Sequence, residues 1–195
     1  MSYRRLGPVV ILLVGIAAQG CAYRGTARDF DPAELKTETG WVSVPHVSPQ
    51  RQDAREDCGI AALGMVLRHY DREVPPAQIE KACPIEPGAG SRAGDMRDFA
   101  KRHGLDAYLI HGELSDFSKE LSRGHPVIVG LVKQYSSGPL THYEVVVALH
   151  PDRKEIVTLD PANGWRSNTL EGFQQEWDAA ARLALVIFPP GESPP

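Results

Sequence analysis

This chain of 195 residues lacks any cluster of basic residues, has only three cysteines and shows no internal repeat. Its 21 lysines and arginines stand singly among 25 aspartates and glutamates, so the sequence gives no indication of nucleic-acid binding. Metal-ligand spacing is also absent, and we expect neither a metal site nor a cofactor. Five histidines are accordingly interpreted as ordinary residues: His69, His103, His111, His125 and His150.

The N-terminus lacks an apolar run long enough to span a bilayer. Its mostly apolar segment, from Leu6 to Ala18, is 13 residues long, whereas a transmembrane helix needs about 20. The segment follows Arg4 and Arg5 and ends in small residues before Cys21, which is the pattern of an export signal. This ending resembles a bacterial lipoprotein box, in which the cysteine is lipidated and becomes the first residue of the mature protein.

We therefore expect residues 1–20 to be a lipoprotein-type signal peptide and Cys21 to carry the lipid, with simple secretion as the alternative. Ala22, rather than aspartate, follows this cysteine, which resembles lipoproteins of the outer membrane. The expected location is the periplasmic side of the cell envelope. Loss of the leader changes the formal net charge from −4 to −6, because the leader carries two basic residues and no acidic residue.

Composition divides the rest of the chain into three parts. Residues 21–43 are rich in charge, glycine and proline, and we expect a tether that ends in a short edge strand near residues 41–44. Residues 44–189 contain the helix and strand patterns of one folded domain. Residues 190–195 form a proline-rich tail.

Apolar periodicity places most helices before most strands. We predict helices over residues 58–70, 75–82, 93–103, 114–122 and 170–181. The predicted strands cover residues 105–110, 126–132, 142–149, 155–160 and 184–188. A glycine- and proline-rich loop is expected over residues 84–91. This order predicts an α+β domain in which a helix that bears Cys58 packs on an antiparallel sheet that bears His142 and Asp160.

Cys58 lies between Asp57 and Gly59 at the start of the first of these helices. The positive end of the helix dipole and the free backbone N–H groups favour the thiolate there. We therefore predict a reactive cysteine at the exposed start of the helix, with Asp57 as the helix cap. A structural disulfide with Cys83 is the alternative in an oxidising compartment. Cys83 itself has no special sequence setting and is interpreted as a half-buried small residue.

A reactive thiol needs a base, a group that orients the base and donors for an oxyanion. His142 opens a predicted strand after a loop rich in serine and glycine, and Asp160 ends the next strand. If the two strands form an antiparallel pair, the start of one lies beside the end of the other. We therefore expect these side chains to be neighbours. The alternatives are an ordinary histidine and a turn aspartate before Pro161.

Together these residues resemble the peptidase C39 family of papain-like cysteine peptidases. The resemblance covers residues 44–188 and rests on an ordered set of motifs: Gln52, Asp57-Cys58-Gly59, Gly124-His-Pro-Val-Ile-Val129, His142-Tyr-Glu-Val-Val and Asp160-Pro161. It implies a papain-like fold, with N-terminal helices that carry the cysteine packed on a sheet that carries histidine and aspartate. It also implies that Cys58 is the nucleophile, His142 the general base and then acid, and Asp160 the orienting carboxylate. Gln52, rather than Gln50, would donate to the oxyanion beside the Cys58 backbone N–H.

The best-known members of that family cut after double-glycine leaders and are fused to export transporters. Here we expect an export signal in the chain itself, and we recognise neither an ATPase pattern nor a transmembrane bundle in the sequence. The resemblance therefore implies a membrane-anchored cysteine peptidase for a secreted or envelope polypeptide, with the identity of any secretion-system partner left open. Two alternatives stay open: a peptide-binding module without turnover, and an amidase or transpeptidase for a non-protein amide.

Overall fold

The computed structural model describes residues 22–54 and 56–192. The expected signal peptide and the lipidation site at Cys21 lie outside the described residues. Within the described ranges, none of the helices combines the length and the apolarity that crossing a membrane would require.

An antiparallel sheet of eight strands forms the centre of the molecule. The strand order is β1-β9-β8-β7-β6-β10-β5, and β2 pairs with β7 beside this path. Its strands are β1 Arg28–Asp29, β2 Val42–Ser43, β5 Asp106–His111, β6 Val127–Tyr135, β7 Gly138–His150, β8 Glu155–Asp160, β9 Gly164–Thr169 and β10 Leu183–Phe188. A separate short hairpin joins β3 Ile85–Glu86 to β4 Gly90–Ser91.

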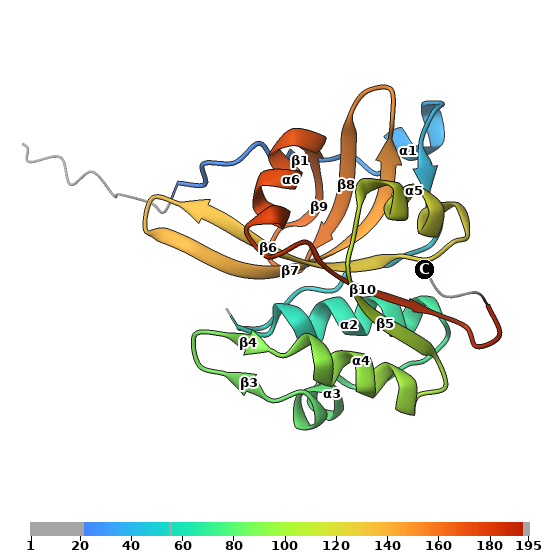
Figure 1. The fold of residues 1–195 in the computed structure, drawn as a ribbon, viewed down its shortest axis with the longest axis vertical. Helices are drawn as coiled ribbons and strands as arrows, with labels where there is room; N and C mark the ends of the chain where they lie inside the picture. The colour runs from blue at the N-terminus through green and yellow to red at the C-terminus, as the bar shows by residue number, and fades with distance from the viewer. Residues whose placement is uncertain (1–21, 55, 193–195) are drawn as a thin grey trace, which may run out of the picture.

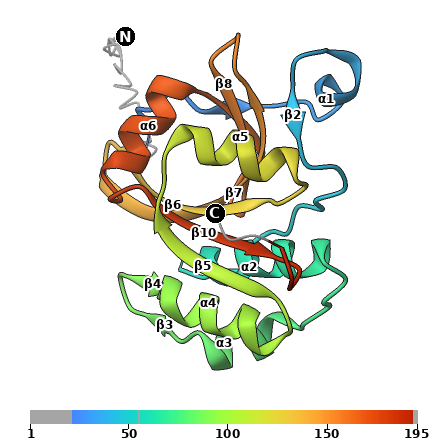
Figure 2. The ribbon, with the colours of Figure 1, turned by 45° about the vertical axis from the view of Figure 1, so that its right-hand side comes forward.

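Six helices in the described residues lie around this sheet. They are α1 Glu34–Thr37, α2 Cys58–His69, α3 Pro76–Ala82, α4 Ala93–Arg102, α5 Leu114–Ser122 and α6 Leu170–Asp178. Figures 1 and 2 show α2, α3 and α4 together on one side of the molecule, with α5, α6 and strands β6 to β9 on the other. The predicted α+β arrangement, a helix with the cysteine packed on a sheet with the histidine and the aspartate, is confirmed.

Helix α2 is a core helix. Ten of its twelve residues are buried, from Cys58 to Leu67, as expected for a helix that is apolar on all sides. A glycine near its start permits close packing, because a Cβ at Gly59 would lie 3.2 Å from Met96 Sδ and 3.3 Å from both Ser91 Cβ and Tyr143 Cδ2. The N-terminus of α2 therefore sits directly against strand β7.

Strand β7 begins earlier than the sequence predicts. It pairs with β6 from Gly138 onward, so that His142 lies inside the strand and not at its mouth. The connection is the two-residue turn Ser136-Ser137, after which Gly138 adopts a φ of 117° that favours glycine. A sequence rich in serine and glycine thus forms a tight hairpin where we expected a longer loop.

The segment expected to be a tether contacts the domain along residues 22–43. Its first residues pair with the tip of the β6–β7 hairpin: Ala22 N donates to Ser136 Oγ at 3.0 Å, and Ser136 N donates to the Ala22 carbonyl at 2.9 Å. Further on, β1 pairs with β9, and Phe30 is buried in the core. The backbone of this segment is thus fixed to the sheet at several points.

Candidate active site

Strands β7 and β8 bring His142 and Asp160 together. Their pairing is antiparallel, with Val145 opposite Leu159, which confirms the expected hairpin. His142 Nε2 lies 2.7 Å from Asp160 Oδ1, and both side chains are buried. The sulfur of Cys58, at the first position of α2, lies near the same imidazole and contributes to the raised pKa of His142. Since Asp160 occupies Nε2, Nδ1 is the ring nitrogen left for the sulfur.

The carboxylate of Asp160 accepts hydrogen bonds on both oxygens. Oδ1 accepts from His142 Nε2 and from the Ala162 backbone N–H at 2.8 Å, and Oδ2 accepts from Asn163 Nδ2 at 2.7 Å. Burial alone would raise the pKa of Asp160, but the hydrogen bonds with His142 and Asn163 hold that pKa well below its usual range. Asp160 is therefore an anion, and Nε2 of His142 carries the proton that it accepts.

The imidazole of His142 is stabilised in its charged form. Burial by itself lowers the pKa of a histidine, but the hydrogen bonds with Asp160 and Cys58 and the negative charge of Glu144 raise the pKa of His142 to about 10. At neutral pH this site therefore holds an imidazolium beside the sulfur of Cys58.

Cys58 is less exposed than its place at the start of a helix suggested. Only 5 % of its surface is accessible, because strand β7 packs against the first turn of α2. Cys58 and Cys83 are both free, so the structure contains no disulfide between them. Cys83 is fully buried rather than half-buried, and burial raises the pKa of its thiol to about 11. Of the two, Cys58 alone has the setting of a reactive thiol.

Gln52 lies beside the Asp160 end of the site, because its backbone N–H donates to the Pro161 carbonyl at 3.0 Å. Its side-chain Nε2 donates to the Ala54 carbonyl at 2.6 Å, within the same loop. An amide NH₂ has two N–H groups, so one donor is left for a ligand. Gln50 is placed elsewhere, with its amide against Gly64 in the middle of α2.

The expected capping of α2 by Asp57 is wrong. The carboxylate of Asp57 instead accepts hydrogen bonds from the backbone N–H groups of Asp53 and Ala54, each at 3.0 Å. The φ and ψ angles of Asp57, −98° and 17°, lie outside the extended region that directs a capping side chain toward the helix. Asp57 thus orders the loop before Cys58 and leaves the N–H groups of the first turn of α2 free of its carboxylate.

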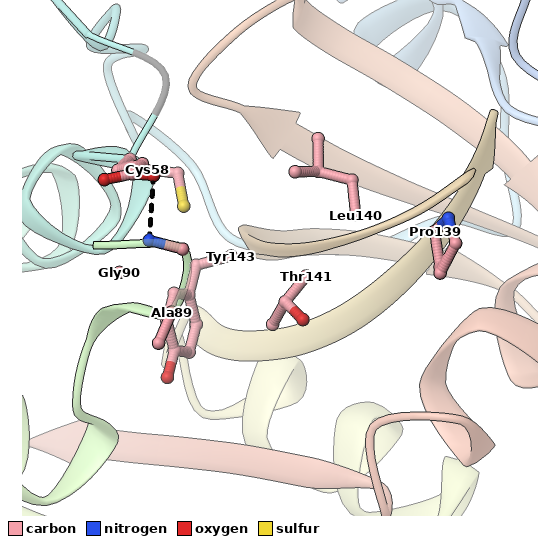
Figure 3. A pocket seen from close by; sticks show the side chains of 9 residues that line it. Cys58, Ala89, Gly90, Pro139, Leu140, Thr141 and Tyr143 are labelled. Carbon is pink, nitrogen blue, oxygen red and sulfur yellow. Dashed lines mark hydrogen bonds between the residues drawn. The ribbon is translucent and has the colours of Figure 1, made fainter. Parts of the chain in front are cut away.

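A cleft with a volume of about 300 Å³ opens at Cys58. One wall is the turn Gly88-Ala89-Gly90 of the β3–β4 hairpin, and the other is the start of β7 at residues 139–141 (Figure 3). Glu56 fixes the glycine turn, because its Oε1 accepts a hydrogen bond from Gly88 N at 2.9 Å. The sulfur thus faces a groove between two backbone segments, which suits an extended chain.

Sequence reasoning missed several residues that complete this site. Tyr143 lines the cleft beside Cys58, and burial with the nearby sulfur raises its pKa to about 12. Asn163 fixes Asp160 from the turn after β8. Glu144 lies beside the His142–Asp160 pair, with one ligand atom of each residue within 4.8 Å of the others. The spacing of two residues from His142 was a signal for Glu144, since alternate strand residues share a face.

The five histidines interpreted as ordinary have hydrogen-bond partners other than Cys58. His69, His103, His111 and His150 each contact a backbone carbonyl, and His125 pairs with Glu120.

Comparison with known proteins identifies the family and the fold of this chain. The model of the peptidase C39 family matches residues 46–189. The chain is 28 % identical over 139 residues to the lactococcin-G-processing and transport ATP-binding protein LagD of Lactococcus lactis, covering 71 % of this chain and 18 % of that protein. It is also 28 % identical over 155 residues to the mesentericin-Y105 transport/processing ATP-binding protein MesD of Leuconostoc mesenteroides, covering 80 % and 20 %. The chain thus spans about a fifth of the length of the curated relatives that it matches.

Two solved structures show the same fold. The peptidase domain of Streptococcus ComA, a bi-functional ABC transporter, superposes with a TM-score of 0.62 at 25 % identity, over 74 % of this chain and 99 % of that domain. A C39-like peptidase from Bacillus anthracis superposes with a TM-score of 0.61 at 15 % identity, over 78 % and 99 %. With a matching family model over most of its length and this fold, the chain belongs to the peptidase C39 family of cysteine-type peptidases.

Proposed function

We propose that this protein is a cysteine peptidase of the cell envelope that cleaves a peptide bond through Cys58, His142 and Asp160. The observation that carries the proposal is the buried hydrogen bond between His142 and Asp160 next to the Cys58 sulfur, which lines the cleft. A thiol, an imidazole and an orienting carboxylate are the three groups that acyl transfer on sulfur requires.

In the first half of the reaction, the Cys58 thiolate attacks the carbonyl carbon of the substrate, and a C–S bond forms. The N–H of Cys58, with the free N–H of Gln52 as second donor, stabilises the oxyanion. His142 then gives its proton to the leaving nitrogen as the C–N bond breaks, and a thioester remains. In the second half, water attacks the thioester, His142 takes the proton from water, and the C–S bond breaks to restore the thiolate.

The substrate proposed is an extended segment of a secreted or envelope polypeptide. The cleft between the glycine turn and the start of β7 supports this, because Gly88, Ala89 and Gly90 have little or no side chain and leave room on that wall for a peptide main chain. LagD and MesD are processing and transport proteins for lactococcin G and mesentericin Y105. Of these two roles, we propose only the processing of an exported peptide for this chain.

Iodoacetamide labelling tests the chemistry. We expect rapid alkylation of one cysteine at pH 7, identified as Cys58 by mass spectrometry and lost in Cys58→Ala. The matched controls are Cys83→Ala and His111→Ala, which should label like the wild type, whereas His142→Ala should label slowly. If His142→Ala labels as fast as His111→Ala, the proposed catalytic pair is wrong.

A comparison of cells tests the activity. Extracellular and envelope polypeptides from cells with the wild-type protein and with Cys58→Ala should differ in at least one precursor that accumulates uncut. Purified wild-type protein should then cut that precursor, and Cys58→Ala should not. Identical polypeptide profiles together with no cleavage by the purified protein would contradict a peptidase function and favour a binding module.

We further propose that a lipid on Cys21 holds the cleft near the membrane surface. The support is the attachment of Ala22 to Ser136 at the tip of the β6–β7 hairpin. The strand after this tip contains Pro139 and Leu140, which line the cleft. A lipidated Cys21 would therefore leave only a few residues between the bilayer and the cleft, which suits a substrate that is presented at the membrane.

Fluorescence quenching tests this orientation. A fluorophore on Ser137→Cys, in the purified lipidated protein with Cys58→Ala and Cys83→Ala, should be quenched by nitroxide lipids in the vesicles. The same fluorophore on Asp152→Cys, at the opposite end of β7, is the control and should be quenched much less. Equal quenching at the two positions would contradict the proposed orientation, and the loss of vesicle binding in Cys21→Ala checks the anchor.

A further inference from the structure

A buried charge network lies behind the His142–Asp160 pair. Lys133, on β6, is 3 % exposed, and its Nζ lies 2.6 Å from Glu144 Oε1 and 3.8 Å from Glu176 Oε2. The second oxygen of Glu144 accepts a hydrogen bond from Thr158 Oγ1 at 2.6 Å. Glu144 is 2 % exposed, so this charge is withdrawn from water and compensated by one lysine.

The strand register explains why Glu144 borders the site. Glu144 follows His142 by two residues on β7, so both side chains leave the same face of the strand. Continuing the β7–β8 register from the pair Val145 and Leu159 places Glu144 opposite Asp160. The 4.8 Å limit on the ligand atoms of the three residues agrees with this placement.

The groups around His142 come from several elements. They are Cys58 on α2, Tyr143 and Glu144 on β7, Asp160 on β8, Lys133 and Tyr135 on β6, Glu176 on α6, and Tyr23 of the N-terminal segment. The phenols are neutral at neutral pH, since the ordinary pKa of tyrosine is about 10 and burial raises the pKa of each of these tyrosines further. Burial also raises the pKa of Glu176, whose hydroxyl partner is Tyr23. Glu144 is thus an acidic neighbour of the imidazole that the catalytic series does not use, and its negative charge contributes to the raised pKa of His142.

The ion pair with Lys133 and the hydrogen bond from Thr158 hold both oxygens of Glu144. A carboxylate fixed in this way cannot rotate to replace Asp160 as the partner of Nε2. Its negative charge nevertheless stays close to the imidazole, where it favours the protonated ring. Three neighbouring ligand side chains could also suggest a metal site, but the Lys133 ammonium already occupies the position that a cation would take beside Glu144.

We propose that Glu144 is a positioning residue of the active site: held by Lys133 and Thr158, it places a fixed negative charge that stabilises the imidazolium form of His142 beside the Cys58 sulfur. This inference rests on the proposed function for its role in catalysis. The effect of Glu144 on His142 can be tested without substrate, so this inference and the proposed peptidase function can fail separately.

The test is a titration of His142 by NMR in purified protein with ¹³C-labelled histidine, with His142→Gln used for assignment. In Glu144→Gln we expect the pKa of His142 to fall by about 1 or more, because a negative charge within a few ångströms is removed. The matched control is Glu155→Gln, at the other end of β8, where a buried glutamate pairs with Arg28. This control should leave the titration of His142 unchanged.

Glu144→Gln leaves Lys133 without its closest partner and can therefore be unstable. A second variant keeps the test valid in that case. Lys133→Met with Glu144→Gln removes both charges and avoids an uncompensated buried ammonium. The pKa of His142 should fall in the double variant as well, but by less than in Glu144→Gln, because the positive charge of Lys133 that opposes Glu144 is removed with it. If the pKa of His142 in Glu144→Gln equals the wild-type value, the proposal is wrong. If Glu144→Gln does not fold, the same outcome in the double variant contradicts the proposal. Iodoacetamide labelling of the same samples reports separately on the peptidase chemistry.

Discussion

At the residue scale, the site depends on an aspartate with three hydrogen-bond donors. His142, Ala162 and Asn163 all donate to Asp160, which fixes the direction of the imidazole as well as its charge. Of these groups, sequence reasoning found Asp160 and His142 because each stands at the end of a predicted strand or near its start. It could not find Asn163, since asparagine after Asp-Pro is an ordinary turn residue.

Asp160→Asn should therefore slow the alkylation of Cys58 at pH 7 by about fourfold or more, because loss of the carboxylate returns the pKa of His142 from about 10 toward the ordinary value of about 6.5, at which about a quarter of the imidazole is protonated at pH 7. The rate with iodoacetamide, followed by intact mass, measures this effect. Asp152→Asn changes an exposed aspartate in the β7–β8 turn and should react at the wild-type rate. A wild-type rate in Asp160→Asn would show that the carboxylate does not support the imidazole.

The pH dependence of peptide cleavage follows from the same pair. His142 has a raised pKa of about 10, so the imidazolium is present below that pH and is lost as the pH rises through it. Cleavage of the identified precursor should thus decline above about pH 10 as the proton for the leaving nitrogen is lost. Initial rates at constant ionic strength measure the decline, with circular dichroism at each pH to show that the protein stays folded. A decline centred near the usual histidine range would contradict the assignment.

At the scale of elements, α2 matters through the closeness of its first turn to β7. A methyl group at Gly59 would press on Met96, Ser91 and Tyr143, all at 3.2 to 3.3 Å. Gly94, in the first turn of α4, has open space around the same position and is the matched control.

Gly59→Ala should destabilise the protein by about 1–2 kcal/mol, because crowding outweighs the gain in helix propensity. Gly59→Ala should also slow the alkylation of Cys58, because Cys58 lies in the same first turn of α2 and moves with it. Gly94→Ala should be neutral or more stable by up to about 1 kcal/mol. Urea unfolding gives both free energies. A stabilised Gly59→Ala with normal alkylation would mean that the packing between α2 and β7 is looser than the structure has it.

Sequence patterns predicted the elements with strong periodicity and missed those without it. The helix at residues 114–122 and the strand at residues 155–160 have the predicted bounds, and the other predicted helices end within three residues of theirs. Strand β9 was not predicted, because Gly164–Thr169 is polar and has no clear alternation. The short β3–β4 hairpin was not predicted either, because its glycines and prolines are typical of a loop. The sequence does not predict that charged residues inside strands, such as Lys133 and Glu144, are buried, because their pairing is seen only in the folded structure.

At the scale of the whole molecule, the sheet begins with a strand from the N-terminal segment. The family model starts at residue 46, but β1 and β2 lie before it, and both belong to the central sheet. The domain that folds is therefore larger than the part that sequence comparison recognises. Tyr23 connects the N-terminal segment to the buried network behind the active site, because its hydroxyl donates a hydrogen bond to Glu176.

Removal of residues 22–45 should lower the free energy of unfolding by several kcal/mol, since Phe30 and Val44 leave the core and Glu176 loses its hydroxyl partner. Thermal unfolding of forms that begin at residues 22 and 46 measures the loss. A form with Phe30→Ala alone should lie between them. Equal melting temperatures for the two lengths would show that the segment contributes no stability.

The attachment of β1 also protects the edge of the sheet. Arg28 and Asp29 pair with Arg166 and Ser167 in the middle of β9, which covers N–H and C=O groups that would otherwise be unpaired. An uncovered edge strand is a template for pairing with another chain. A recombinant protein trimmed to the recognised family region would therefore expose β9 and tend to self-associate edge to edge. Poor solubility of such a form would reflect a missing strand and not an unstable peptidase fold.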